Sequence, residues 1–85
     1  MYRLEVARQA RKEMARLSPE VRRRLLRAIH RLTEEPYPAG CKRLRGTPAY
    51  AVRVGDYRIV YRVDDEQGLV IVIRAKHRKD VYRDL

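Results

Sequence analysis

Two alternating segments separated by only two residues constrain the fold of this chain most. Residues 50–54 and 57–63 both alternate between the two faces of an extended chain, which is typical of half-buried strands. Gly55-Asp56 between them has the length and composition of a tight hairpin turn. Because a two-residue turn sets the pairing of its strands, Arg53 should lie directly opposite Arg58. The chain is therefore expected to contain an antiparallel hairpin with an apolar face and a basic face.

The segments around this hairpin complete an α+β pattern. Residues 2–6 alternate like a strand, and residues 69–75 form a short apolar strand. Between residue 7 and the loop at 36–48, the apolar positions recur at helical spacing, and Ser18-Pro19 marks the start of a second helix. We predict an N-terminal strand, a helical hairpin and a three-stranded antiparallel meander, with the helices packed on one face of the sheet.

The last strand is expected to extend the basic face of the hairpin. Pairing Val63 with Leu69 would keep the odd-numbered apolar residues of that strand on the core face. This register places Arg74 opposite Arg58, so with Arg53 a row of arginines would cross three strands. Like charges directly opposite one another destabilise a sheet. Either the long side chains spread into solvent or the row binds a phosphate and stabilises charge on it.

The charge balance indicates the partner. Lys and Arg number 21 against 11 Asp and Glu, which gives a formal net charge of +10 in 85 residues. Such a length suits one domain, which we expect to span residues 1–85. The excess is of one sign and mostly arginine, whose planar fork matches a phosphate, so a nucleic acid is a better explanation than a surface of balanced ion pairs.

The sequence also predicts a cytoplasmic protein without a membrane partner. Cys41 is the single cysteine, so no intrachain disulfide is expected, which fits a reducing compartment. The longest apolar run, residues 69–73, is far too short to span a bilayer, and the N-terminus has no signal-peptide pattern.

Three segments together resemble the RelE/ParE toxin superfamily. They are Lys42-Arg43-Leu44-Arg45-Gly46, the stretch from Val52 to Val63, and His77-Arg78-Lys79-Asp80-Val81-Tyr82. Each segment alone is a weak signal, but the combination is fairly specific, and the resemblance covers nearly the whole chain.

This resemblance implies the toxin of a type II toxin–antitoxin system, with a RelB-like antitoxin as partner. The RelE branch is an endoribonuclease that cuts messenger RNA in the ribosomal A site. The implied reaction is attack of a ribose 2′-hydroxyl on the adjacent phosphate, with neither metal nor cofactor. The sequence agrees, because it lacks a cluster of carboxylates and histidines at metal-ligand spacing. The alternative is the ParE branch, which binds DNA gyrase and cuts nothing.

The resemblance also implies site residues. Arg58 matches the arginine after the hairpin tyrosine, Arg53 matches one of two basic positions on the preceding strand, and the other basic position falls at Ala51. The implied catalytic residues are Arg53, Arg58, Lys76, His77 and Tyr82. Lys76 takes the basic position after the last strand by ungapped alignment, and His77 or Arg78 would take it if the register slips. We expect further basic residues around the row to bind RNA, namely Lys42, Arg45, Arg62, Arg74 and Arg78.

Two features separate the branches. The loss of a basic residue at Ala51 weakens the case for cleavage and keeps the gyrase-binding alternative open. His77 and Tyr82 favour the enzyme, because a gyrase binder needs no proton-transfer groups beside a phosphate clamp. Tyr82 could instead cover the sheet edge, and His77 could instead cap the end of the chain.

Overall fold

The computed structural model describes residues 1–77 of the 85-residue chain, and these residues form two helices and a five-stranded sheet. The order along the chain is β1 (Arg3–Val6), α1 (Arg8–Ala15), α2 (Pro19–Glu34), β2 (Lys42–Arg43), β3 (Tyr50–Val54), β4 (Tyr57–Asp64) and β5 (Leu69–His77). The predicted α+β class and element order are confirmed. The expectations for Arg78 and Tyr82 fall outside the described residues.

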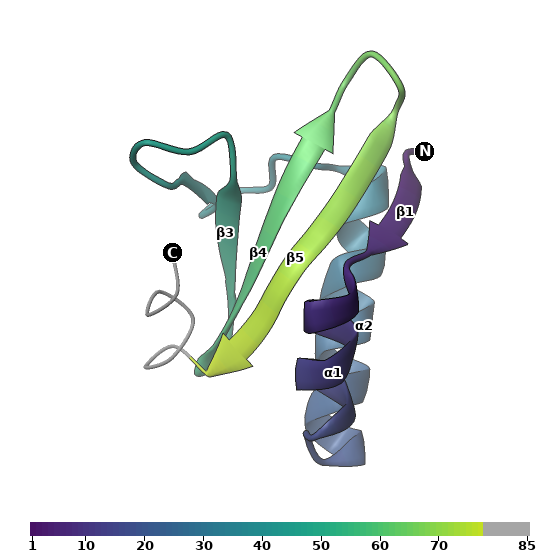
Figure 1. The fold of residues 1–85 in the computed structure, drawn as a ribbon, viewed down its shortest axis with the longest axis vertical. Coiled ribbons are helices and arrows are strands. Elements are labelled where there is room, and N and C mark those ends of the chain that lie inside the picture. The colour runs from purple at the N-terminus through teal and green to yellow at the C-terminus, as the bar shows by residue number, and fades with distance from the viewer. Residues whose placement is uncertain (78–85) are drawn as a thin grey trace.

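The helical hairpin forms where the sequence predicts it. Ser18 caps α2, because its Oγ accepts a hydrogen bond from the backbone N–H of Val21 at 3.3 Å, and Pro19 occupies the first helical position. Both helices cover one face of the sheet, and their apolar stripes contribute Ala10, Met14, Leu25, Ile29 and Leu32 to the main core (Figure 1).

The sheet contains one strand more than the sequence predicts. Its order is β1-β5-β4-β3-β2, with β1 parallel to β5 and the other neighbours antiparallel. The additional strand is β2, two residues inside the expected loop, and it pairs Lys42 with Ala51 at the edge of β3. A two-residue strand has no periodicity that a sequence pattern could reveal.

The β3–β4 hairpin has the predicted register. All five expected pairs are present, including Arg53 opposite Arg58. Gly55 adopts a φ of +60° in the turn, a left-handed conformation that glycine reaches without steric cost. The predicted core face is also confirmed, because Ile59 and Tyr61 are fully buried against the helices.

The register between β4 and β5 differs from the prediction. Val63 lies opposite Val70 and not opposite Leu69, which shifts the pairing by one residue. A β-bulge at Ile73 then shifts it by one more, because Tyr61 pairs with Val72 while Val60 pairs with Arg74. The core face of β5 therefore holds Val70, Val72 and Ala75, and the predicted set of Leu69, Ile71 and Ile73 is wrong.

The loop after α2 is anchored on both sides before it reaches β2. The Tyr61 hydroxyl donates to the carbonyl of Pro36 at 2.7 Å, and burial raises the pKa of Tyr61. The Tyr37 hydroxyl donates to Asp65 at 2.8 Å, and this bond raises the pKa of Tyr37 to about 12. These contacts hold the segment that leads to Lys42.

No helix within residues 1–77 is long and apolar enough to cross a membrane.

Candidate functional site

Three basic residues form a row across the face of the sheet that the helices leave uncovered. Arg53 on β3 lies opposite Arg58 on β4, and Arg58 lies opposite Lys76 on β5. Two members of the predicted row, Arg53 and Arg58, lie opposite each other as expected, but the third position is taken by Lys76 and not by Arg74. Neighbouring positively charged side chains in a sheet are unfavourable for folding, so the row calls for an explanation beyond stability.

A hollow of about 240 Å³ lies at the Arg53 end of this row, and we call it the Arg58 hollow. It is lined by Gly40, Lys42, Ala51, Arg53 and Arg58. Lys42 enters it from β2, directly opposite Ala51 in the strand register. Among residues 1–77, three cations and no acid line the hollow, so it is suited to hold an anion of the size of a phosphate group.

The two arginines of the hollow are held by backbone oxygens. Arg53 Nε donates to the carbonyl of Gly55 at 3.1 Å, which draws its exposed side chain toward the β3–β4 turn. Arg58 is half-buried, and its Nη1 donates to the carbonyl of Tyr57 at 3.4 Å. These bonds limit the positions that the guanidinium groups can take before any ligand binds.

Ala51 occupies the position at which the resemblance implies a second basic residue on β3. It is 5% exposed and packs with Ala49 and Val60 in a small apolar cluster on the uncovered face. A long charged side chain at this position would displace that cluster. The nearest basic side chain in the strand register is that of Lys42 on β2.

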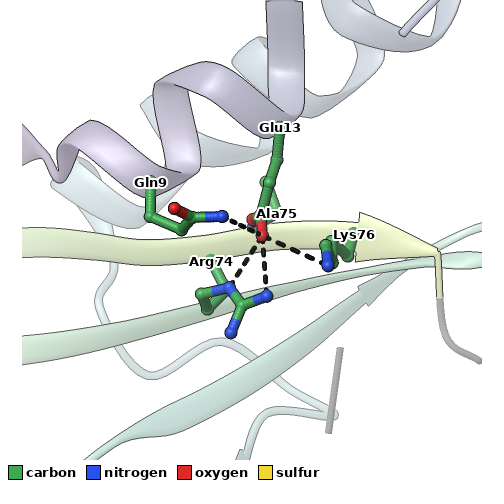
Figure 2. A network of polar contacts seen from close by, with 5 residues as sticks. All are labelled: Gln9, Glu13, Arg74, Ala75 and Lys76. Carbon is green, nitrogen blue, oxygen red and sulfur yellow. Dashed lines mark hydrogen bonds and ion pairs between the residues drawn. The ribbon is translucent and has the colours of Figure 1, made fainter. Parts of the chain in front are cut away.

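Arg74 does not join the row, contrary to the sequence-based expectation. Because of the shifted register and the bulge, it lies opposite Val60, and its side chain is buried. Its guanidinium pairs with Glu13 on α1, with Nε and Nη2 each 2.8 Å from Oε2 (Figure 2). Arg74 is therefore tied into the structure between α1 and β5.

Glu13 is the residue of this region that the sequence analysis missed. Its carboxylate also accepts the backbone N–H of Ala75 at 2.9 Å and Gln9 Nε2 at 3.3 Å (Figure 2). Burial alone would raise the pKa of Glu13, but the hydrogen bonds from Arg74, Ala75 and Gln9 outweigh it and lower the pKa below its ordinary value. A signal was available, because Glu13 follows Ala10 by three residues and so lies on the apolar stripe of α1.

Lys76, the third member of the row, also contacts this buried carboxylate. Its Nζ is 3.7 Å from Glu13 Oε2, while its backbone pairs with Arg58 (Figure 2). The Lys76 side chain is 31% exposed, whereas that of Glu13 is only 5% exposed. The ammonium group is thus at the surface and has a carboxylate partner on one side.

His77 faces away from the row. It lies opposite Tyr57 in the register, and the two rings meet edge to face with centroids 5.5 Å apart. Since neighbouring residues of a strand point to opposite faces, His77 and Arg58 lie on different faces of the sheet. The expected adjacency of His77 and the arginine row is not observed.

The other expected RNA-binding residues are spread over the surface. Arg62 is exposed on β4, four residues beyond Arg58 on the same face. Arg45 is exposed and lines a separate hollow in the loop between β2 and β3. Arg78 and Tyr82 lie outside the described residues.

This combination of fold and basic face is that of a known class of toxins. Residues 4–82 match the family described as the ParE toxin of the type II toxin–antitoxin system parDE. Toxin RelG of Mycobacterium tuberculosis (strain ATCC 25618 / H37Rv) is 34% identical over 86 residues, which cover 96% of this chain and 97% of RelG.

Solved structures agree with this match. The isolated RelE toxin of E. coli is 34% identical, with a TM-score of 0.79 over 99% of this chain and 94% of that chain. A chain of the RelBE2 toxin–antitoxin complex of Mycobacterium tuberculosis is 30% identical, with a TM-score of 0.82 over 91% and 98% of the two chains. A chain of the archaeal RelE–RelB complex of Pyrococcus horikoshii OT3 is 29% identical, with a TM-score of 0.81 over 94% and 98%.

The chain belongs to the RelE/ParE toxin superfamily. It is a toxin of the type II toxin–antitoxin class, and its structural relatives are RelE toxins, several of them solved together with RelB antitoxins.

Proposed function

We propose that this toxin is a ribosome-dependent endoribonuclease that cleaves messenger RNA in the A site. The observation that carries this proposal is the row of Arg53, Arg58 and Lys76 beside a hollow whose charged lining, within the part of the chain that the structure describes, is entirely cationic. In the proposed reaction the ribose 2′-oxygen attacks the adjacent phosphorus and the bond from phosphorus to the 5′-oxygen breaks. The products are a 2′,3′-cyclic phosphate and a 5′-hydroxyl, and no metal takes part.

Arg58 and Arg53 would stabilise the charge that develops on the phosphoryl oxygens. A guanidinium presents two parallel N–H donors to two phosphoryl oxygens in a fixed planar geometry, which an ammonium lacks. The half-buried Arg58 lies between the other two members of the row, so we assign it the largest share.

Lys42 would supply the positive charge that Ala51 does not. It lies directly opposite Ala51 and lines the same hollow as Arg53 and Arg58. The absence of a basic residue at position 51 then weakens the site less than the sequence alone implies.

Of the three candidates for the basic position after the last strand, the geometry supports Lys76. Lys76 pairs with Arg58, whereas His77 packs on Tyr57 on the other face. We propose that the Lys76 ammonium moves from Glu13 to the phosphate when RNA binds. Tyr82 stays the proposed group that orients the 2′-hydroxyl or accepts its proton.

We also propose that the toxin acts in the cytoplasm and that a RelB-like antitoxin neutralises it. Relatives of this fold have been solved as complexes with RelB. A protein with a net charge of +10 favours an acidic or amphipathic partner that covers its basic face.

A second candidate is a gyrase inhibitor of the ParE type. The match of residues 4–82 to a family described by its ParE toxin favours it, as does the alanine at position 51. Such a protein would need neither a phosphate clamp nor a group for proton transfer.

One pair of assays separates the two candidates. The purified toxin is added to ribosomes programmed with a defined messenger, and the RNA ends are mapped with and without EDTA. The proposal expects cuts within the A-site codon, 5′-hydroxyl ends and no loss of activity in EDTA. Intact messenger together with inhibited supercoiling by purified gyrase would overturn it in favour of the gyrase inhibitor.

A further inference from the structure

A second basic cavity lies on the other side of β3, between this strand and α2. It measures about 390 Å³, and we call it the α2–β3 groove. Its lining residues with charge are Arg24, Arg27, Arg31 and Arg53. Its apolar wall includes Ala28, Leu32, Val52 and Val54. The proposed reaction site does not explain this groove, because Arg53 is the one residue within 1–77 that belongs to both.

The arginines of α2 make a like-charged stripe. Arg24, Arg27 and Arg31 are three and four residues apart, so they lie on one side of the helix and span about 10 Å along it. Like charges at this spacing destabilise a helix. All three are exposed, and within residues 1–77 none of their side chains has an ion pair or a hydrogen bond to another residue. The stripe is thus available to an external anion.

The groove and the Arg58 hollow meet at the β3–β4 turn. The Arg24 guanidinium lies close to Gly55. A Cβ added to Gly55 would be 2.9 Å from Arg24 Nη2. Arg53 donates to the carbonyl of the same Gly55 and lines both cavities. A chain of positive charge therefore runs from Arg31 along α2, past the turn, to Arg58.

We propose that the α2–β3 groove binds the phosphate backbone of an RNA strand. This inference rests on the proposed function in taking RNA as the polyanion. Successive arginines suit a ligand with regularly repeated phosphates, and the apolar wall offers a surface to ribose and base. Continuity with the Arg58 hollow favours RNA over an acidic protein segment. The phosphates could belong to the messenger or to ribosomal RNA, and the test distinguishes these two sources.

The test compares two triple variants with equal loss of charge. The groove variant is Arg24→Gln, Arg27→Gln and Arg31→Gln. The control variant is Arg3→Gln, Arg8→Gln and Lys12→Gln, all exposed residues of β1 and α1 that line none of the cavities described above. Their thermal unfolding is compared first. A third variant with lysine at positions 24, 27 and 31 keeps the charge and should retain most of the binding.

Binding is measured to a single-stranded 2′-O-methyl oligonucleotide, which lacks the attacking hydroxyl, and to ribosomes without messenger. We expect the groove variant to bind at least one of these probes about tenfold more weakly or worse, with the slope of log K against log salt reduced by about two for the oligonucleotide. The control variant should stay within about twofold of the wild type. Loss for the oligonucleotide identifies the messenger as the source, and loss for the empty ribosome identifies ribosomal RNA.

Equal binding of both probes by the groove and control variants would overturn the inference. Poly-glutamate serves as a third probe. If the groove variant lost binding to poly-glutamate alone, the inference would be overturned in favour of an acidic protein partner. Failure of the proposed function gives a different result from failure of this inference. The wild-type toxin would then leave the messenger intact but would still bind the probes through the groove. The Arg58→Ala variant should show the same separation, with cleavage lost and oligonucleotide binding largely kept.

Discussion

Glu13 on α1 and Arg74 on β5 form a buried ion pair, with Oε2 2.8 Å from both Nε and Nη2. Their side chains are 5% and 8% exposed. The other carboxylate oxygen accepts the backbone N–H of Ala75, at a point on β5 beyond the last residue that pairs with β1. Glu13 thus pairs with the buried charge of Arg74. It also accepts a backbone N–H at the part of the β5 edge that β1 does not cover.

Glu13→Gln should lower the free energy of unfolding by about 3 kcal/mol, because it removes the carboxylate charge that pairs with the buried Arg74 guanidinium. The glutamine carbonyl can still accept the Ala75 N–H, so the change isolates the charge. Urea unfolding followed by circular dichroism measures the effect. The double variant Glu13→Gln, Arg74→Met should recover most of the loss. An unchanged free energy in the single variant would mean that the pair does not contribute to stability.

The same pair predicts how stability depends on acid. Since the pKa of Glu13 is below its ordinary value of 4.5 in the folded protein, its contribution is fully present above pH 4.5. This contribution is lost as the pH falls through the folded pKa. The difference in unfolding free energy between the wild type and Glu13→Gln should therefore shrink steadily below pH 4.5. A difference that grows on acidification would contradict the lowered pKa of Glu13.

Arg58→Ala should lower the single-turnover cleavage rate on programmed ribosomes by about a hundredfold or more, because its charge acts mostly in the transition state. Arg58→Lys should recover only part of the rate, since an ammonium lacks the two-point fork. Arg3→Ala is the control, since Arg3 is an exposed arginine of β1 that lines none of the cavities described above. Cleavage at the parent rate by a folded Arg58→Ala protein would rule out the proposed site.

Lys42→Ala should lower the same rate by about tenfold, because it removes one of the three cations that residues 1–77 contribute to the Arg58 hollow. Its neighbour Arg43 is the control, since the two side chains of this short strand point to opposite faces. Arg43→Ala should change the rate by less than about twofold. If both variants lose activity equally, Lys42 does not compensate for Ala51.

Association with the antitoxin should depend strongly on salt. A toxin with a net charge of +10 attracts an acidic partner over long range, so the association rate should fall about tenfold or more between about 50 and about 500 mM salt. Stopped-flow fluorescence of the co-purified pair, separated and remixed, measures this rate. A rate that is constant across this range would exclude electrostatic steering.

The part of the fold that could be predicted from the sequence is the part with short, well-specified connections. The two-residue turn at Gly55-Asp56 permits only one register, so the opposition of Arg53 and Arg58 followed directly from the sequence. Ser18 and Pro19 likewise predict the start of α2, because serine caps a helix N-terminus and proline favours the first helical position.

The register of β5 could not be predicted because nothing in the sequence specifies it. The turn before β5 is longer, and residues 69–73 are apolar on both faces, so no alternation sets the phase of the strand. The structure shows why both faces are apolar, since Val60 and Ile73 belong to a second small cluster on the uncovered face. Glu13 was missed because a single acid on a basic helix resembles a solvated residue.

The bulge at Ile73 divides β5 into two halves with opposite phase. Before it, even-numbered residues such as Val72 face the helices, and after it, the odd-numbered Ala75 does. In the first half Val70 and Val72 contact the core, while in the second half Ala75 contacts the core and Arg74 and Lys76 contact Glu13. Random variation of residues 74–77 would therefore test folding as well as activity, whereas deletion of Ile73 alone would remove the bulge and leave the residues after it on the faces that they already occupy.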